Sequence, residues 1–178
     1  MTEATNALEL EPKSIARTSE LEATYALLCE ASERLRARGI AQWRVPYPRA
    51  RFERDIASGS VWCWRAEGAL AATLTVSSMR PDYYPNEIWR DDIAAWYLTR
   101  FVVAQRFARR GVGARVLAEV GMAANAAGVR ALRLDVTAAN PFLERYYVGH
   151  GFRRVGEAEI HGEPSLLLER PSNGFVPA

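Results

Sequence analysis

The hydrophobic and polar positions of the chain follow a helical period in some segments and a strand period in others. The first helical stretch covers residues 19–39, opening with the capping-box spacing of Ser19 and Glu22 and ending at Gly39. Its apolar face consists of Leu21, Tyr25, Leu28, Cys29 and Leu35. We expect a short edge strand before this helix, at residues 14–18, and a second short helix at residues 49–58.

Strand-like runs dominate the middle of the chain. Residues 60–78 predict a hairpin that turns near Glu67 and Gly68. A long irregular connection, dense in aromatic and acidic residues, precedes a strong strand at residues 95–104. The remaining elements are expected in this order: a helix at 112–128, a strand at 131–137, a short helix opened by Asn140 and Pro141, and two antiparallel strands at 152–160 and 165–170.

This order of elements predicts one α+β domain. The chain has 178 residues, of which 49% are hydrophobic, enough for a single core. We place the domain at residues 14–170, after a flexible leader at 1–13 and before a C-terminal tail at 171–178. Neither an internal repeat nor a low-complexity segment interrupts it.

Composition narrows the possible partners. The net charge is only +2, which does not support nucleic-acid or membrane binding through bulk charge. The N-terminus lacks the apolar core of a signal peptide, and no apolar run approaches the ~20 residues that span a bilayer. Cys29 and Cys63 fall in different elements and have no neighbouring His or Cys, so we expect free thiols, no metal site and a cytoplasmic location.

The stretch ARRGVGARVL, residues 108–117, places two spaced glycines where a strand gives way to a helix. Such glycines can serve a tight turn alone. A Walker-type phosphate loop is excluded, since no Gly-Lys-Ser/Thr follows. A Rossmann fingerprint fits poorly, because Val116 stands at the third glycine position and the strand ends several residues before Gly111.

A third interpretation uses more of the chain. Residues 100–117 and 132–156 together resemble the Gcn5-related N-acetyltransferase (GNAT) family, which carries Gln/Arg-x-x-Gly-x-Gly/Ala after a strand ending in valine. Here the glycines are Gly111 and Gly113. The family's second motif, Asn with Tyr seven residues later and Gly-Phe four beyond, is matched by Asn140, Tyr147 and Gly151 with its following phenylalanine. One position departs, because Ala108 stands where Gln or Arg is expected.

The resemblance implies a mixed, mostly antiparallel twisted sheet that is splayed at a cofactor cleft, with flanking helices. It also implies acetyl-CoA as co-substrate, with its pyrophosphate on the free N–H groups of a helix start and its pantetheine on a strand edge. Arg110 or Arg115 would add charge at the rim. The cofactor-binding residues implied are Phe101, Val102, Val103, Arg109, Arg110, Gly111, Val112, Gly113, Ala114, Asn140 and Phe142.

Tyr147 is the expected catalytic residue, because a phenol beside the sulfur can give a proton to the departing thiolate. Its neighbour Tyr146 is expected to pack or to line the acceptor site. Asn140, before a proline, also fits a helix cap, and we expect it to play that role. Four acids remain open as the general base: Asp135, Glu87, Asp91 and Asp92.

The main indication of the acceptor substrate is a group of aromatic residues near acidic residues, a combination that suits a cationic amine. These rings lie in residues 39–47 and 80–96, and they are Trp43, Tyr47, Tyr83, Tyr84 and Trp89. We expect a small-molecule primary amine, such as an amino acid or its conjugate, attacking directly in a ternary complex. A protein or peptide amine, and a catalytically silent acyl-CoA sensor, remain alternatives; a homodimer is expected only from the resemblance.

Overall fold

The computed structural model describes residues 8–89, 91 and 93–173. In these residues the strands form one seven-stranded sheet of order β1-β2-β3-β4-β5-β7-β6. Neighbouring strands are antiparallel except for β4 and β5, which are parallel. The strands are β1 (Ser14–Ile15), β2 (Val61–Ala66), β3 (Ala69–Ser77), β4 (Ala95–Val103), β5 (Ala131–Thr137), β6 (Arg153–Ile160) and β7 (Glu163–Pro171).

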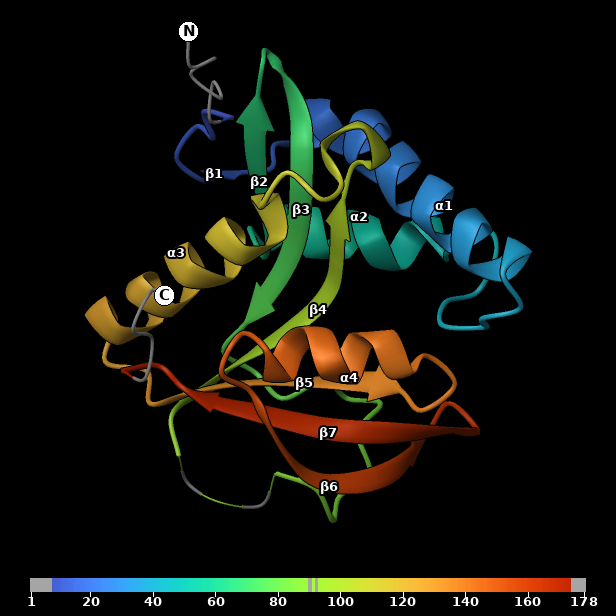
Figure 1. Ribbon diagram of the computed structural model, residues 1–178, viewed down its shortest axis with the longest axis vertical. Coiled ribbons are helices and arrows are strands. Elements are labelled where there is room, and N and C mark those ends of the chain that lie inside the picture. Colours follow the sequence, from blue (N-terminus) through green and yellow to red (C-terminus); the bar gives the residue numbers. More distant parts are fainter. Residues whose placement is uncertain (1–7, 90, 92, 174–178) are drawn as a thin grey trace, which may run out of the picture.

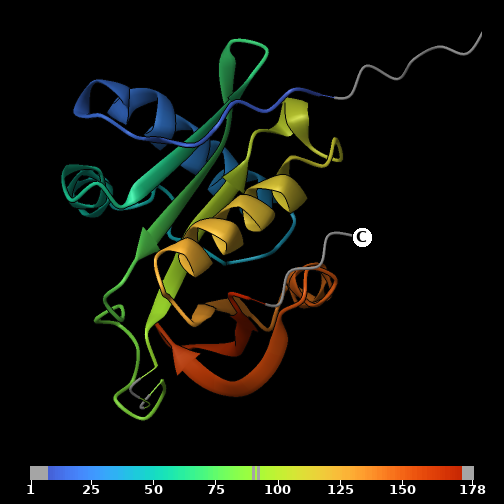
Figure 2. The ribbon, with the colours of Figure 1, turned by 90° about the vertical axis from the view of Figure 1, so that its left-hand side faces the viewer.

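Helices cover both faces of the sheet. Figure 2 shows α1 and α2 on one face and α3 on the other, while α4 lies across β5 in Figure 1. Each helix buries an apolar stripe against the strands, for example Val116, Leu117 and Val120 of α3. The helices are α1 (Leu21–Ala37), α2 (Arg49–Ala57), α3 (Val112–Ala126) and α4 (Pro141–Val148), with single 3₁₀ turns η1 (Thr18–Glu20) and η2 (Gln105–Phe107).

The parallel strands β4 and β5 separate after a short stretch of pairing. Their register runs only from Ala95 opposite Ala131 to Tyr97 opposite Arg133. Beyond it, β4 continues with β3 and β5 continues with β7, so the two halves of the sheet turn away from each other (Figure 1). A bulge in β4 accompanies this separation: the β3 register shifts between Thr73 and Thr75, and Arg100 has φ 53°. The result is a fork in the centre of the sheet.

The α+β fold with a splayed, mostly antiparallel sheet is therefore confirmed, and so is the hairpin at Glu67 and Gly68, both of which have positive φ. The capping-box prediction was wrong by two residues. Glu20, not Glu22, accepts the hydrogen bond from the Arg17 amide, and the helix begins only after the 3₁₀ turn.

Hydrogen bonds at both ends of the domain involve residues that lie beyond its predicted boundaries. In the leader, the Lys13 amide donates to Glu119 of α3 over 3.0 Å, and the Glu11 amide donates to the Arg65 carbonyl over 2.8 Å. At the other end, the Ser172 amide donates to the Arg130 carbonyl over 3.1 Å. Residues 1–7 and 174–178 lie outside the described part, so the boundaries at 14 and 170 stay predictions.

Two further observations concern sequence expectations. Cys29 and Cys63 are free thiols, and burial raises the pKa of Cys63 to about 12, which makes it an inert core residue. Within the described ranges, none of the helices has the length and apolar character needed to cross a bilayer.

Candidate active site

A cavity of about 510 Å³ opens in the fork between β4 and β5. Its floor comes from the diverging strands, Leu98 to Phe101 on one side and Leu134 to Thr137 on the other. Tyr147 of α4 lines it as well, together with residues of the α1–α2 connection and of the β6–β7 hairpin. The volume is in the range of sites for small ligands. The separation of the two strands thus creates the space that the resemblance implied.

Asp135 is a carboxylate of this cavity that has a hydrogen-bond partner. It lies on β5, and the hydroxyl of Tyr84 donates to its Oδ1 over 2.7 Å. Burial raises the pKa of Asp135 above the ordinary value, and the Tyr84 hydrogen bond opposes that rise. A carboxylate whose pKa is raised is a stronger base than an ordinary one, and so it is better suited to accept a proton from an ammonium group.

Tyr147 faces the same cavity from α4. Its residue is 8% exposed, and its ring packs edge-on against Tyr146 and Phe152 at centroid distances of 5.3 and 5.4 Å. Burial raises the pKa of Tyr147, assisted by the nearby Tyr146 and Asp135, so the phenol stays protonated at neutral pH. Its hydroxyl forms no hydrogen bond with the described residues, which leaves it available as a donor.

The glycine turn lies at the other side of α4, at the start of α3. Gly111 precedes the helix with φ 78°, a left-handed conformation that a side chain would strain, although space for a Cβ exists there. Arg109 also has positive φ, 62°. Within the described residues, no acceptor is bonded to the amides of Arg109 and Gly111 or of the first three helical residues, Val112 to Ala114. These donors match the expected phosphate seat.

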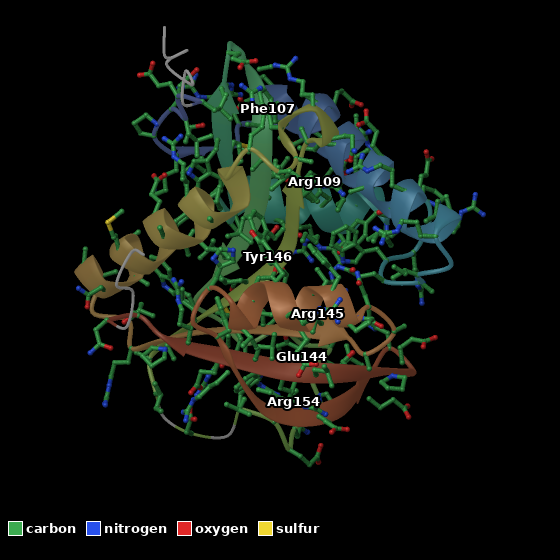
Figure 3. All side chains as sticks on the ribbon, viewed as in Figure 1. Phe107, Arg109, Glu144, Arg145, Tyr146 and Arg154 are labelled. Atoms are coloured by element: carbon green, nitrogen blue, oxygen red, sulfur yellow. The ribbon has the colours of Figure 1, made fainter. Side chains whose placement is uncertain are left out.

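The close approach at Gly113 is made by a tyrosine. A Cβ added there would lie 2.1 Å from the Tyr146 hydroxyl and 3.7 Å from a methyl group of Val103. Figure 3 shows Tyr146 on the side of α4 that faces β4 and the start of α3. Packing or acceptor lining was expected for Tyr146, and the structure shows packing. Because Gly113 has no Cβ, the Tyr146 side chain of α4 can reach the start of α3.

The two arginines expected at the rim already have partners. Arg110 forms an ion pair with Glu67 at 2.7 Å, and its amide donates to the Phe107 carbonyl over 3.3 Å. Arg115 donates to the Leu8 carbonyl. The Arg110 pair is exposed on both sides, so it can be exchanged for another anion at small cost. The Arg110 amide, in contrast, does not belong to the free donors.

The other predicted cofactor residues divide by location. Phe101 lines the cavity, whereas Val102 is 4% exposed and belongs to the core, and Val103 packs beside Gly113. Among the described residues, the edge of β4 that faces β5 has no strand partner beyond Tyr97, so its backbone groups remain open there. Phe142 is 57% exposed and stacks on Tyr146 at 5.9 Å.

Asn140 takes the N-cap position of α4 and precedes Pro141, as expected. Its side chain, however, makes no hydrogen bond to the helix N-terminus, although the residue is only 5% exposed. The predicted capping bond is therefore not formed. A buried amide side chain that bonds to none of the described residues is suited to bind a polar ligand at this position.

The other described base candidates do not line the cavity. Asp91 forms an ion pair with the buried Arg133, which lowers the pKa of that carboxyl chiefly through their hydrogen bond. Glu87 is also absent from the cavity wall. Asp92 lies outside the described residues. Of the three acids that the structure describes, Asp135 is the one on the cavity wall.

Sequence reasoning missed several charged residues of the cavity. Arg44 and Arg51 line it from the α1–α2 connection and from α2, and Arg100 lines it from β4. His161 and Glu163 line it from the β6–β7 hairpin. Of the five expected aromatic residues, Trp43, Tyr47 and Tyr83 line the cavity, whereas Trp89 lies against the guanidinium of Arg133 at 4.7 Å. The arginines carried no sequence signal, because arginine is spread throughout this chain.

Comparison with known proteins agrees with this geometry. The model of the acetyltransferase (GNAT) family matches residues 21–152. The uncharacterized N-acetyltransferase YesJ of Bacillus subtilis (strain 168) is 31% identical over 144 residues, which cover 77% of this chain and 78% of that protein.

Solved structures show the same fold. A GNAT-family acetyltransferase from Listeria monocytogenes has a TM-score of 0.75 at 22% identity, covering 92% of this chain and 94% of that one. Another from Streptococcus agalactiae has a TM-score of 0.78 at 19% identity, covering 91% and 95%. At these identities the structures establish architecture, while the family match and the relative from Bacillus subtilis establish descent. The chain belongs to the GNAT family of acetyltransferases.

Proposed function

We propose that this protein is an acetyl-CoA-dependent N-acetyltransferase that acts on the primary amine of a small molecule by direct attack in a ternary complex. The observation that carries the proposal is the strand fork. Its cavity is lined both by a carboxyl group with a raised pKa, Asp135, and by a protonated phenol, Tyr147. A base and an acid that face one space are what amine acylation requires.

The residues present fit coenzyme A. The unpaired amides from Gly111 to Ala114 would hold the pyrophosphate at the positive end of α3, the open edge of β4 would bond the pantetheine amides, and Asn140 would add a side-chain amide. Hydrogen bonds to charged groups are worth about 1.5–3 kcal/mol each, so the backbone supplies most of the grip. The Ala108 departure therefore costs one contact rather than the site.

The two cavity residues have complementary tasks. Acetyl-CoA supplies an activated acyl group with a thiolate leaving group. Asp135 would take a proton from the incoming ammonium, which is otherwise charged because amines have pKa values near ~10.4. Tyr147 would donate a proton or hydrogen bond to the departing sulfur.

The shape of the cavity supports a small acceptor. It is bounded by the residues 41–48, by α2 and by the hairpin at His161, so the approach to Asp135 is restricted on several sides. A protein amine would have to reach Asp135 as an extended terminus or a long side chain. A silent acyl-CoA sensor would have no use for a carboxyl group and a phenol that both face the cavity.

Two measurements test the proposal. Titration calorimetry should register acetyl-CoA binding, and a thiol-release assay with a panel of primary amines should show turnover. Replacing Tyr147→Phe should lower kcat by about 10²-fold or more while leaving acetyl-CoA affinity nearly unchanged. The exposed Arg154→Gln, which pairs with Glu144 and Glu157 away from the cavity, serves as the control (Figure 3). Absence of acetyl-CoA binding, or full activity of the Tyr147→Phe variant, would contradict it.

A further inference from the structure

The fork cavity carries opposite charges on the two halves of the fold. Arg44 and Arg51 line it from the α1–α2 connection and from α2. Asp135 and Glu163 line it from β5 and from the start of β7. A cavity with both signs of charge is electrostatically matched to a molecule that itself carries a cation and an anion.

Of the three arginines that line the cavity, Arg51 combines donors to spare with a described aromatic ring against which it is held. The guanidinium of Arg100, whose side chain is 8% exposed, is occupied: it pairs with Asp55 at 2.7 Å, donates to the Tyr47 hydroxyl over 3.0 Å and donates to Thr75 over 3.2 Å. Arg51 has one polar contact with the described residues, a 3.5 Å pair with Asp82. Because the Asp82 side chain is 94% exposed, water screens that pair and a ligand anion can replace it.

The Arg51 guanidinium is nevertheless held in place. It lies over the ring of Tyr83, with 5.0 Å between its central carbon and the ring centroid, and its side chain is 33% exposed. Tyr83 is itself packed against Tyr84 and against the His161 ring, both at 4.8 Å between centroids. A stacked guanidinium keeps its planar edge available for two parallel hydrogen bonds to a carboxylate.

Tyr83 and Tyr84 also set the relative positions of the two charged ends of the cavity. Arg51 contacts Tyr83, Tyr83 contacts Tyr84, and the Tyr84 hydroxyl donates to Asp135. The cationic end and the acidic end are therefore separated by two aromatic side chains along one wall. An acceptor whose amine reaches Asp135 and Tyr147 would present groups on its far side to Arg51.

We propose that Arg51 binds a carboxylate of the acceptor, so that the substrate class of this transferase is the amino carboxylates. The inference deepens the proposed function and rests on it for the acylated amine. In this arrangement the ammonium group of the substrate enters at the Asp135 end, where it loses its proton. The carboxylate is anchored at the Arg51 end and orients the amine toward the acyl group.

The test compares each amine with its own carboxamide. The panel contains glycine, β-alanine, 4-aminobutyrate and lysine, which vary the spacing between amine and carboxylate, and kcat/KM is measured with acetyl-CoA. The free acids should exceed their carboxamides by about 10- to 100-fold, the range expected for hydrogen bonds to a charged group. Arg51→Gln should remove this preference, mainly by raising KM for the acids. Arg54→Gln, on the same helix but not lining the cavity, should retain it.

Each outcome decides one of the two proposals. Equal rates for acids and carboxamides, or equal losses for both in Arg51→Gln, would overturn the amino-carboxylate assignment and leave the transferase in place. If acetyl-CoA binds but no amine on the panel is acetylated, calorimetric titration with the same acids tests the carboxylate site directly. Binding that Arg51→Gln abolishes would support the site, and absence of binding would overturn it. Failure of acetyl-CoA binding would count against the transferase alone.

Discussion

Asp135 combines a catalytic proposal with a cost to folding. Burial raises its pKa in the folded protein above the ordinary value of 3.8, so ionising it there is unfavourable. Between the unfolded and folded pKa values the folded protein binds more protons than the unfolded chain, and stability falls as pH rises through that window. Above the folded pKa the full cost is present, whereas below the unfolded pKa it is absent.

Asp135→Asn is therefore expected to be more stable than the parent protein but inactive. The asparagine carbonyl can still accept the Tyr84 hydrogen bond, so the variant removes the charge and keeps the contact. Urea denaturation should give a higher free energy of unfolding than the parent at pH 7 and no difference below about pH 4. Turnover should fall by about 10²- to 10⁴-fold, the usual contribution of a general base. A variant that is destabilised at pH 7 would show that the ionised carboxylate is well solvated.

Helices α3 and α4 meet where Tyr146 lies against Gly113, and this contact predicts a specific rescue. Gly113→Ala places a methyl group 2.1 Å from the Tyr146 hydroxyl, and overpacking of this kind costs about 1–3 kcal/mol. It should also weaken acetyl-CoA binding, since the displaced helix start carries the phosphate donors. Adding Tyr146→Phe removes the nearest atom and leaves the ring carbon at 3.3 Å, so part of the stability should return.

Gly111→Ala is the matched control for that rescue. Its φ of 78° makes any side chain strained, but no atom lies within 4 Å of the added Cβ. Tyr146→Phe should therefore leave the loss in Gly111→Ala unchanged. Recovery in both glycine variants would mean that Tyr146→Phe stabilises the protein generally, without relieving a clash.

Elements were predictable where local patterns decide them. The hairpin turn at Glu67 and Gly68, the α3 stripe and the Asn140-Pro141 helix start all rest on neighbouring residues, and all were found. The details that local patterns did not give depend on contacts across the fold. The missing capping bond of Asn140 and the contact of Tyr146 with Gly113 are set by how α4 packs in the folded protein, and no local spacing encodes that packing.

The site residues likewise divide into those that a local pattern indicates and those that only the folded chain brings together. Tyr147 was found through a motif, and Asp135 was one of four acids that only the strand fork could separate. Arg51 had no distinguishing neighbour in the sequence, because its partner Tyr83 lies in a different segment and the two meet only in the folded chain.

At the scale of the whole molecule, the two halves of the sheet are joined by little strand pairing. Between β4 and β5 the register covers Ala95 to Tyr97 only, and beyond it the two strand edges that face each other have no strand partner in the described part of the chain. A coenzyme bonded to the β4 edge and seated on α3 beneath α4 would connect both halves. Ligand binding should then raise the stability of the whole domain, and the effect should not be confined to a single loop.

Acetyl-CoA at a hundred times its Kd should raise the free energy of unfolding by about 2.7 kcal/mol, the value that mass action sets for a ligand of the folded state. Hydrogen exchange should locate the effect: the amides of Phe101 and Val103 and those of Gly111 to Ala114 should slow most, because these donors have no acceptor among the described residues without the ligand. The outer strand pair β6–β7 is the internal control and should change least. Protection confined to that pair would place the coenzyme outside the fork and would contradict the assigned seat.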